Sequence, residues 1–329
     1  MLVLLSVSSI VFVLLLRAAC SLYLSRRFAS HEGTDGQVFA ASGYRLGYHL
    51  QRPEGPSKGL ILLIHGANSG KATMDFLLAE ALLEEGFSTL SVDRPGAGES
   101  RLWAHNETIH DPRGAALLIR ALLEHLDLAT EDVLVLGYSM GATVALALGS
   151  LAPAQTRGIV ALAGVAAPYV STRNLYDLLL VPVVGVMVRF LYPILAVTVG
   201  LRTIASLKPR GGAWSDVDLA RSGLAGGLLD ANTIHGSTLS RRTNALALSS
   251  LLPALRAAEL PTLILWPEHE QVVHPRHRDT LAGLHKKSLV RSLDDTDHYC
   301  PFFPSSAYRI AEEVNEVFEA GFFEAGWHA

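Results

Sequence analysis

Apolar residues along the chain alternate between short runs with strand character and longer stretches with helical spacing. The short runs predict strands at 44–50, 59–64, 88–92, 132–137, 158–163, 262–266 and 288–293. The longer stretches predict helices at 74–85, 112–126, 142–148 and 305–318. Because strands that alternate with helices are joined by crossover connections, this order predicts an α/β fold with a mostly parallel sheet.

One segment, from residue 168 to about residue 249, interrupts this alternation and contains no clear strand. Its most apolar part, residues 178–200, contains Pro182, Arg189 and Pro193, so two short helices fit it better than a membrane-spanning helix. We expect an inserted helical cap that shelters a pocket or lies against a bilayer; simple packing of these helices on the sheet is the alternative. The predicted parts are therefore a segment 1–30, a core part 31–167, a cap 168–249 and a second core part 250–329.

The N-terminal residues 1–24 are almost entirely apolar, with Arg17 as the one charge, and Arg26 and Arg27 follow. A helix over these residues would be about 36 Å long, enough to cross a bilayer. An uncleaved membrane anchor fits best, because a signal peptide carries its basic residues before the apolar run. Signal cleavage with secretion, or a buried helix of a soluble protein, are the alternatives. The basic residues after the helix favour a cytoplasmic location for the rest of the chain.

Composition excludes several classes of protein. Hydrophobic residues make up 50% and charged residues 18% of the 329 residues, which excludes an extended disordered chain. The formal net charge of −4 argues against a nucleic-acid binder that relies on a basic surface. Cys20 and Cys300 are the only two cysteines, so no disulfide framework holds the fold, and we expect Cys300 to be a small buried thiol.

The strongest chemical signal is a G-x-S-x-G motif, residues 137–141, between a predicted strand and a predicted helix. Gly137 and Gly141 permit a sharp turn that lifts the Ser139 hydroxyl above the carboxyl edge of the sheet. Ser139 is therefore the candidate nucleophile. In this chain order the base comes last, and His298 lies on the loop between the last predicted strand and the last predicted helix.

The carboxylate that would orient such a histidine is expected on the loop after the strand at 262–266. Glu268 and Glu270 both lie there. We favour Glu270, because the Val272–Val273 pair after it resembles the apolar step that follows the acid in related loops. Glu268 is the alternative, and three acids close to His298 in sequence also compete: Asp294, Asp295 and Asp297.

Histidines on the same loop raise the question of a metal site. His269, His274 and His277 are accompanied by no H-E-x-x-H spacing and no cysteine pair, so we expect solvated loop histidines and no metal.

Backbone amides that could hold an oxyanion are expected at two turns. Ala67 follows a predicted strand in the sequence His65-Gly66-Ala67, and Met140 directly follows Ser139, so both amides are candidates. A phosphate loop is the competing interpretation of the first turn, since Gly70 and Lys71 follow the strand. That motif fails at two positions, where His65 replaces the first glycine and Ala72 the Ser or Thr.

Together these motifs resemble the α/β-hydrolase superfamily of serine hydrolases, of the lipase, esterase and monoacylglycerol-lipase-like type. The resemblance spans about residues 44–318 and rests on 65–67, on Asp93–Ser100, on 137–141, on the Glu270 loop and on His298. It implies an eight-stranded sheet with a cap inserted after the sixth strand, and a structural turn at Asp93–Ser100. The chain departs from the family pattern at three positions: Glu270 stands where Asp is commoner, Pro267 where Gly is usual, and Asp297 where a Gly usually precedes the histidine.

The predicted function is hydrolysis of a carboxylic ester through an acyl-enzyme, with no cofactor required. The apolar cap and the N-terminal helix favour lipid-like or long-acyl substrates at a membrane. An acyltransferase, amidase or peptidase could use the same residues. A non-catalytic, membrane-bound binding module on the same fold is the alternative from a different class.

Overall fold

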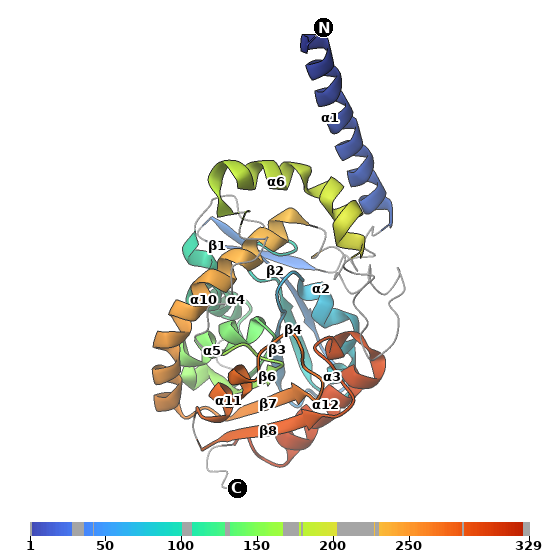
Figure 1. The fold of residues 1–329 in the computed structure, drawn as a ribbon. Helices are drawn as coiled ribbons and strands as arrows, with labels where there is room; N and C mark the ends of the chain where they lie inside the picture. Colours follow the sequence, from blue (N-terminus) through green and yellow to red (C-terminus); the bar gives the residue numbers. More distant parts are fainter. Residues whose placement is uncertain are drawn as a thin grey trace.

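The computed structural model describes residues 2–27, 36–41, 43–100, 107–128, 132–166, 178, 180–202, 227, 230–284 and 286–324. At its centre lies an eight-stranded sheet in the order β1-β2-β4-β3-β5-β6-β7-β8 (Figure 1). The strands are β1 (Gln37–Ala41), β2 (Tyr44–Gln51), β3 (Leu60–Ile64), β4 (Ser88–Val92), β5 (Val133–Tyr138), β6 (Thr156–Leu162), β7 (Thr262–Pro267) and β8 (Ser288–Leu293). The pairs β1–β2 and β2–β4 are antiparallel, and all pairs from β4 to β8 are parallel. The α/β fold with a mostly parallel, eight-stranded sheet is thus confirmed.

Strands β3, β4 and β5 are buried along their whole length, which explains why their sequences are near-continuous apolar runs. The sequence pattern did not predict strand β1. Its residues are exposed or half-buried, and it is held mainly by antiparallel pairing with β2 across a turn at Gly43, whose φ is 81°. An edge strand of this kind leaves no long apolar run in the sequence.

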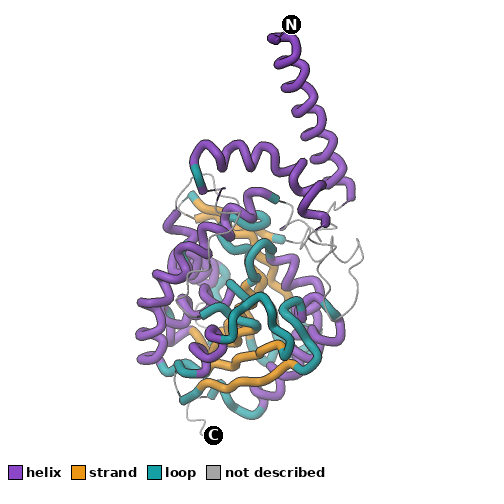
Figure 2. The backbone as a smooth tube through the Cα atoms, in the orientation of Figure 1, coloured by secondary structure: helices purple, strands orange, loops and turns teal. Residues whose placement is uncertain are grey.

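Helices cover both faces of the sheet (Figure 2). On one face the core is formed with α4 (Pro112–His125), α5 (Gly141–Leu151) and α10 (Ala231–Ala258). On the other face it is formed with α2 (Lys71–Met74), the π-turn η1 (Asp75–Ala79), α3 (Glu80–Glu84) and α12 (Pro304–Glu319). The short elements are α11 (Arg276–Ala282) and the 3₁₀ turns η2 (Glu107–His110), η3 (Pro153–Gln155) and η6 (Cys300–Phe302). Cys300 is buried in this second core, as expected.

The segment between β6 and β7 holds α6 (Pro182–Leu195), the π-turn η5 (Ala196–Gly200) and all of α10. The expected division of residues 178–200 into two short helices is not observed: α6 begins at Pro182, runs through Arg189 and Pro193 and continues into η5. Helix α10 begins at a cap where the Asp230 side chain accepts from the Thr233 amide, and it continues past residue 249. The rest of the predicted cap, residues 168–177, 179, 203–226 and 228–229, lies outside the described residues.

Helix α1 (Leu2–Arg27) projects away from the remainder of the protein (Figure 1). Within the described ranges it is the one helix long and apolar enough to cross a membrane, and little of it is buried. Its exposure excludes the alternative of a buried helix in a soluble core. A contact between α1 and α6 is made by Arg17, whose Nε donates to the Phe190 carbonyl at 2.9 Å and whose guanidinium carbon lies 4.9 Å from the Phe190 ring centroid.

Candidate active site

The turn between β5 and α5 carries Ser139 in a left-handed conformation, with φ 51°. Its amide donates to the Leu162 carbonyl at 2.8 Å, and its carbonyl accepts from the Ala142 and Val165 amides. Neither neighbouring glycine has a positive φ; each is required by close packing instead. A Cβ on Gly137 would collide with the backbone of Ala142, and one on Gly141 would overlap the Ile64 carbonyl oxygen. The predicted sharp turn is present, and Ser139 sits on it, 7% exposed.

His298 and Glu270 are brought together from loops 28 residues apart. The loop after β8 carries His298 and the loop after β7 carries Glu270, and their Nδ1 and Oε2 atoms are 2.7 Å apart. Both side chains are buried, at 8% and 2% exposed. The other Glu270 oxygen accepts from the Val272 and Val273 amides at 2.6 and 2.8 Å. Since an ionised carboxylate only accepts, His298 donates from Nδ1 and keeps Nε2 as an acceptor.

Ser139 and His298 are linked through Tyr138, the residue before the serine. The Tyr138 hydroxyl donates to the His298 carbonyl at 2.7 Å, and the centroids of the two rings lie 5.3 Å apart. Between Ser139 and His298 themselves the described structure has no hydrogen bond within 3.5 Å. Catalytic hydrogen bonds are often long before substrate binds, so this arrangement is compatible with a serine–histidine pair.

Three of the four competing acids are held by other groups. Glu268 accepts from the Asp295 amide at 2.8 Å, and Asp297 accepts from the Tyr299 amide at 2.9 Å. Asp294 forms an ion pair with Arg309. These contacts hold the loop between β8 and η6 in shape, while Glu270 alone of the two glutamates has a hydrogen bond with His298 in the described part of the chain.

The loop histidines differ from expectation at one position. His277 is buried, and its Nδ1 accepts from the Ala166 amide at 3.0 Å, so the expectation of a solvated side chain was wrong there. Burial lowers its pKa. His269 lies 3.6 Å from Glu268, and His274 accepts from the Arg276 amide. Among the residues that the structure describes, no cluster of His, Cys, Asp or Glu could hold a metal ion.

The two candidate oxyanion amides lie on turns that touch each other. A Cβ on Gly66 would lie 3.2 Å from the Ser139 Cβ, so the loop after β3 packs directly against the serine. The amides of Ala67 and Met140 donate no hydrogen bond to any described residue, which leaves both N–H groups available to a ligand.

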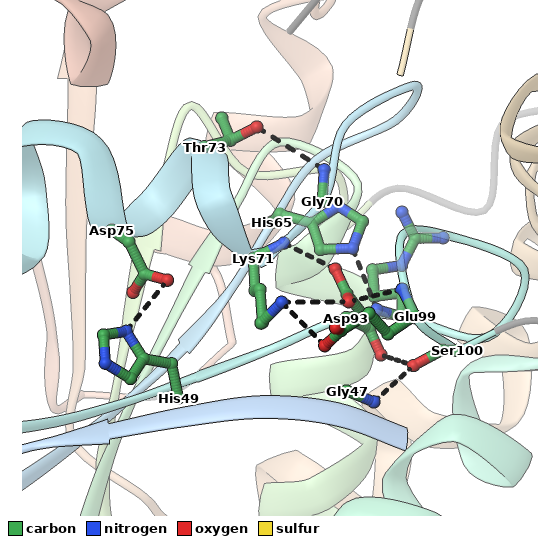
Figure 3. Close-up of polar contacts among 11 residues, drawn as sticks. Gly47, His49, His65, Gly70, Lys71, Thr73, Asp75, Asp93, Glu99 and Ser100 are labelled. Carbon is green, nitrogen blue, oxygen red and sulfur yellow. Dashed lines mark hydrogen bonds and ion pairs between the residues drawn. The ribbon is translucent and has the colours of Figure 1, made fainter. Parts of the chain in front are cut away.

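Behind the loop after β3 lies a buried polar network that the sequence did not reveal in detail (Figure 3). Asp93 accepts from the Lys71 amide at 2.7 Å and from the Glu99 amide at 2.9 Å. Burial raises the pKa of Asp93 to about 6, while Lys71 opposes that rise. The Lys71 ammonium lies 3.0 Å from Glu99 and 3.7 Å from Asp93. Because Lys71 forms ion pairs with Glu99 and Asp93, its ammonium group is already engaged within the protein, which is a further reason to reject a phosphate loop.

A model of the family described as "Alpha/beta hydrolase family" matches residues 61–313. The chain belongs to this family. No curated protein matches the sequence.

Solved structures similar to this α/β-hydrolase support the same fold. A thermophilic esterase from Thermogutta terrifontis has a TM-score of 0.59 and 18% identity, over 86% of this chain and 96% of the other. A membrane phospholipase A, described as a novel bacterial virulence factor, has a TM-score of 0.61 and 18% identity, over 98% of this chain and 97% of the other. An α/β-hydrolase fold protein from Nakamurella multipartita has a TM-score of 0.57 and 18% identity, over 87% and 99%. At these identities the likeness shows the fold alone.

Proposed function

We propose that this α/β-hydrolase cleaves carboxylic esters through an acyl-enzyme, with Ser139 as nucleophile, His298 as base and Glu270 as the acid that orients it. The buried hydrogen bond of 2.7 Å between Glu270 and His298, on loops beside the Ser139 turn, carries this proposal. Because Glu270 faces His298, we do not favour a non-catalytic binding module.

The reaction follows from the protonation states. His298 Nε2 takes the Ser139 proton as Oγ attacks the ester carbonyl, and the Ala67 and Met140 amides donate to the oxyanion that forms. Glu270 stabilises the resulting imidazolium without accepting its proton. The imidazolium then protonates the leaving alkoxide, and a water activated by His298 releases the acid and regenerates Ser139. No cofactor takes part in these steps.

The test of this function is labelling by a fluorophosphonate probe, followed by p-nitrophenyl esters of short and long acyl chains. We expect one probe per chain and faster hydrolysis of the longer esters, with labelling absent from Ser139→Ala. Cys300→Ser is the matched control that should keep its labelling, since burial raises the pKa of that thiol well above its usual range. A folded native protein that neither labels nor hydrolyses any ester would refute the function.

Lipid-like or long-acyl esters are the proposed substrate class, because the protein presents a wide apolar surface on α6. One stripe of α6 is exposed at helical spacing: Val183 is 74%, Val186 58% and Met187 58% exposed. The opposite face packs inward, where Tyr192 of α6 and Ala196 of η5 form a buried cluster with Ile234 of α10. The membrane phospholipase A resembles the chain in fold over nearly its whole length, which includes most of α1.

We further propose that α1 anchors the protein in a membrane and that the exposed stripe of α6 lies in the same bilayer surface. Arg17 supports this arrangement, since its contacts with Phe190 join the two helices. Arg26 and Arg27 at the end of α1 favour a cytoplasmic position for the catalytic part.

Substituting two valines of the α6 stripe by Asp should separate membrane-borne from soluble substrates. In the full chain, Val183→Asp with Val186→Asp should lower turnover of an ester carried in phosphatidylcholine vesicles about tenfold or more, because burial of apolar surface is lost. Turnover of a short soluble ester should stay unchanged. Leu117→Asp, at an exposed apolar site on α4, is the matched control and should alter neither rate.

Equal loss on both substrates would contradict the membrane role of α6. Extraction of the native chain by alkaline carbonate, with residues 1–27 missing from the recovered protein, would show that α1 is a cleaved signal and not an anchor.

A further inference from the structure

The amide of Ala67 belongs to the same peptide unit as the carbonyl of Gly66. That carbonyl oxygen accepts hydrogen bonds from three side chains. His65 Nδ1 lies 2.8 Å from the Gly66 oxygen, Arg94 Nη1 lies 3.0 Å from it, and Ser69 Oγ lies 3.2 Å from it. A carbonyl oxygen has two lone pairs, so this one is fully engaged. The orientation of the peptide is therefore fixed from its carbonyl side, while its N–H remains available.

The direction of these hydrogen bonds is settled by the backbone. The Arg94 amide donates to His65 Nε2 at 2.8 Å, so Nε2 carries no hydrogen and the proton sits on Nδ1. Nδ1 then donates to Gly66. Burial, with a smaller effect of the Arg94 charge, lowers the pKa of His65 to about 3. The imidazole is therefore neutral at pH 7 and carries its one proton on Nδ1.

Arg94 is a buried cation without a carboxylate partner. Arg94 is 4% exposed, and in the described part of the chain no carboxylate lies within 4.0 Å of its guanidinium. The bond to Gly66 is the one hydrogen bond that its side chain makes there, and its Nε has no partner. Burial lowers the pKa of Arg94 to about 10, so the group stays charged at neutral pH. An unpaired buried charge is costly, which requires a compensating role.

We propose that Arg94 is a positioning residue of the oxyanion hole, which fixes and polarises the Gly66–Ala67 peptide through the Gly66 carbonyl. This inference rests on the proposed function. A positive charge at the carbonyl end of a peptide strengthens the donor at its N–H end, because hydrogen bonds in series polarise one another in a low-dielectric interior. The effect grows as negative charge develops on the substrate oxygen, so it stabilises the transition state more than the bound ester.

The test compares three variants of the full chain. Arg94→Met keeps the length of the side chain and removes the charge; Arg94→Lys keeps the charge and loses the planar fork; Ser69→Ala removes a neutral donor. We expect Arg94→Met to lower kcat per probe-labelled Ser139 about tenfold or more with KM unchanged, and Arg94→Lys to recover part of the loss. Arg120→Met, at an exposed arginine of α4, is the matched control and should behave like the native chain.

A second readout separates positioning from a structural role. A trifluoromethyl ketone forms an oxyanion with the active serine, so its affinity should fall in Arg94→Met by the same factor as kcat/KM. If Arg94→Met lowers only the melting temperature and the labelled fraction, with kcat and ketone affinity per labelled site unchanged, the inference is wrong.

Ser69→Ala keeps the buried charge and should lower kcat less than Arg94→Met. If Arg94→Met does not fold, Arg94→Gln replaces it as the variant that removes the charge, and unchanged kcat and ketone affinity per labelled site in that variant overturn the inference. A native chain inactive on every ester would instead refute the proposed function.

Discussion

Replacing Glu270 by Gln should lower kcat by about 10⁴-fold and leave the folded protein intact. The Gln oxygen can still accept from the Val272 and Val273 amides, so the loop keeps its hydrogen bonds. The Gln nitrogen then faces His298 Nδ1 and donates to it, which moves the imidazole proton to Nε2. In that tautomer the imidazole cannot take the Ser139 proton.

Glu268→Gln is the matched control for this prediction. Its side chain is 49% exposed and accepts from a single amide, that of Asp295, so kcat should stay within about threefold of the native value. The measurement is kcat on a p-nitrophenyl ester for both variants, with melting temperatures to verify folding. A larger loss in Glu268→Gln than in Glu270→Gln would assign the acid to the other glutamate.

Replacing Gly141 by Ala should prevent the protein from accumulating in its folded state. The new Cβ would overlap the Ile64 carbonyl oxygen at the end of β3, and that backbone atom cannot move without disturbing the pairing of Ile64 with Gly137. We expect a loss of more than about 4 kcal/mol, a large fraction of the stability of an ordinary domain.

Gly55→Ala is the control for the same substitution in open space, since no neighbouring atom lies within 4 Å of the position that its Cβ would take. It should leave the melting temperature within about 1 °C of the native value. Circular dichroism and limited proteolysis of both variants measure the difference. A Gly141→Ala protein that melts like the native chain and keeps its activity would show that β3 and α5 can separate at this point.

The position of Arg94 explains a feature of the segment Asp93–Ser100 that the family resemblance assigns only to a structural turn. Asp93 ties the turn to α2 through the Lys71 amide, and the next residue, Arg94, reaches the Gly66 carbonyl. The turn thus connects the sheet edge with one of the two candidate oxyanion amides. Within this turn, Asp93 supplies the structural hydrogen bonds and the adjacent Arg94 supplies the proposed positioning of the Gly66–Ala67 peptide.

The membrane proposal depends on surfaces that the fold leaves uncovered. Helix α6 packs one face on Ile234 and presents the other, apolar face to solvent, next to α1. Burial of that face in a bilayer would remove apolar surface from water, which is the same driving force that forms the core.

The sequence by itself determined seven of the eight strands of the sheet and the sharp turn that carries Ser139. Strands such as β3 and β4 lie where the apolar pattern placed them, because a strand covered by helices on both faces is buried along its whole length. The turn at Ser139 also follows from local sequence, since a glycine at position 137 leaves room for the backbone of Ala142. These features depend on a few consecutive residues, and a pattern can therefore reveal them.

Only the tertiary structure decided the features that depend on residues far apart in the chain. The choice between Glu268 and Glu270 depends on which carboxylate faces His298, a contact across two loops. The hydrogen bond of the buried His277 comes from the Ala166 amide, which is 111 residues away in the chain. In the sequence Arg94 is one basic residue of a predicted turn, and only the fold brings its guanidinium within 3.0 Å of the Gly66 carbonyl oxygen. Hydrogen bonds and desolvation act between neighbours in space, so their outcome is set by the fold and not by the order of residues.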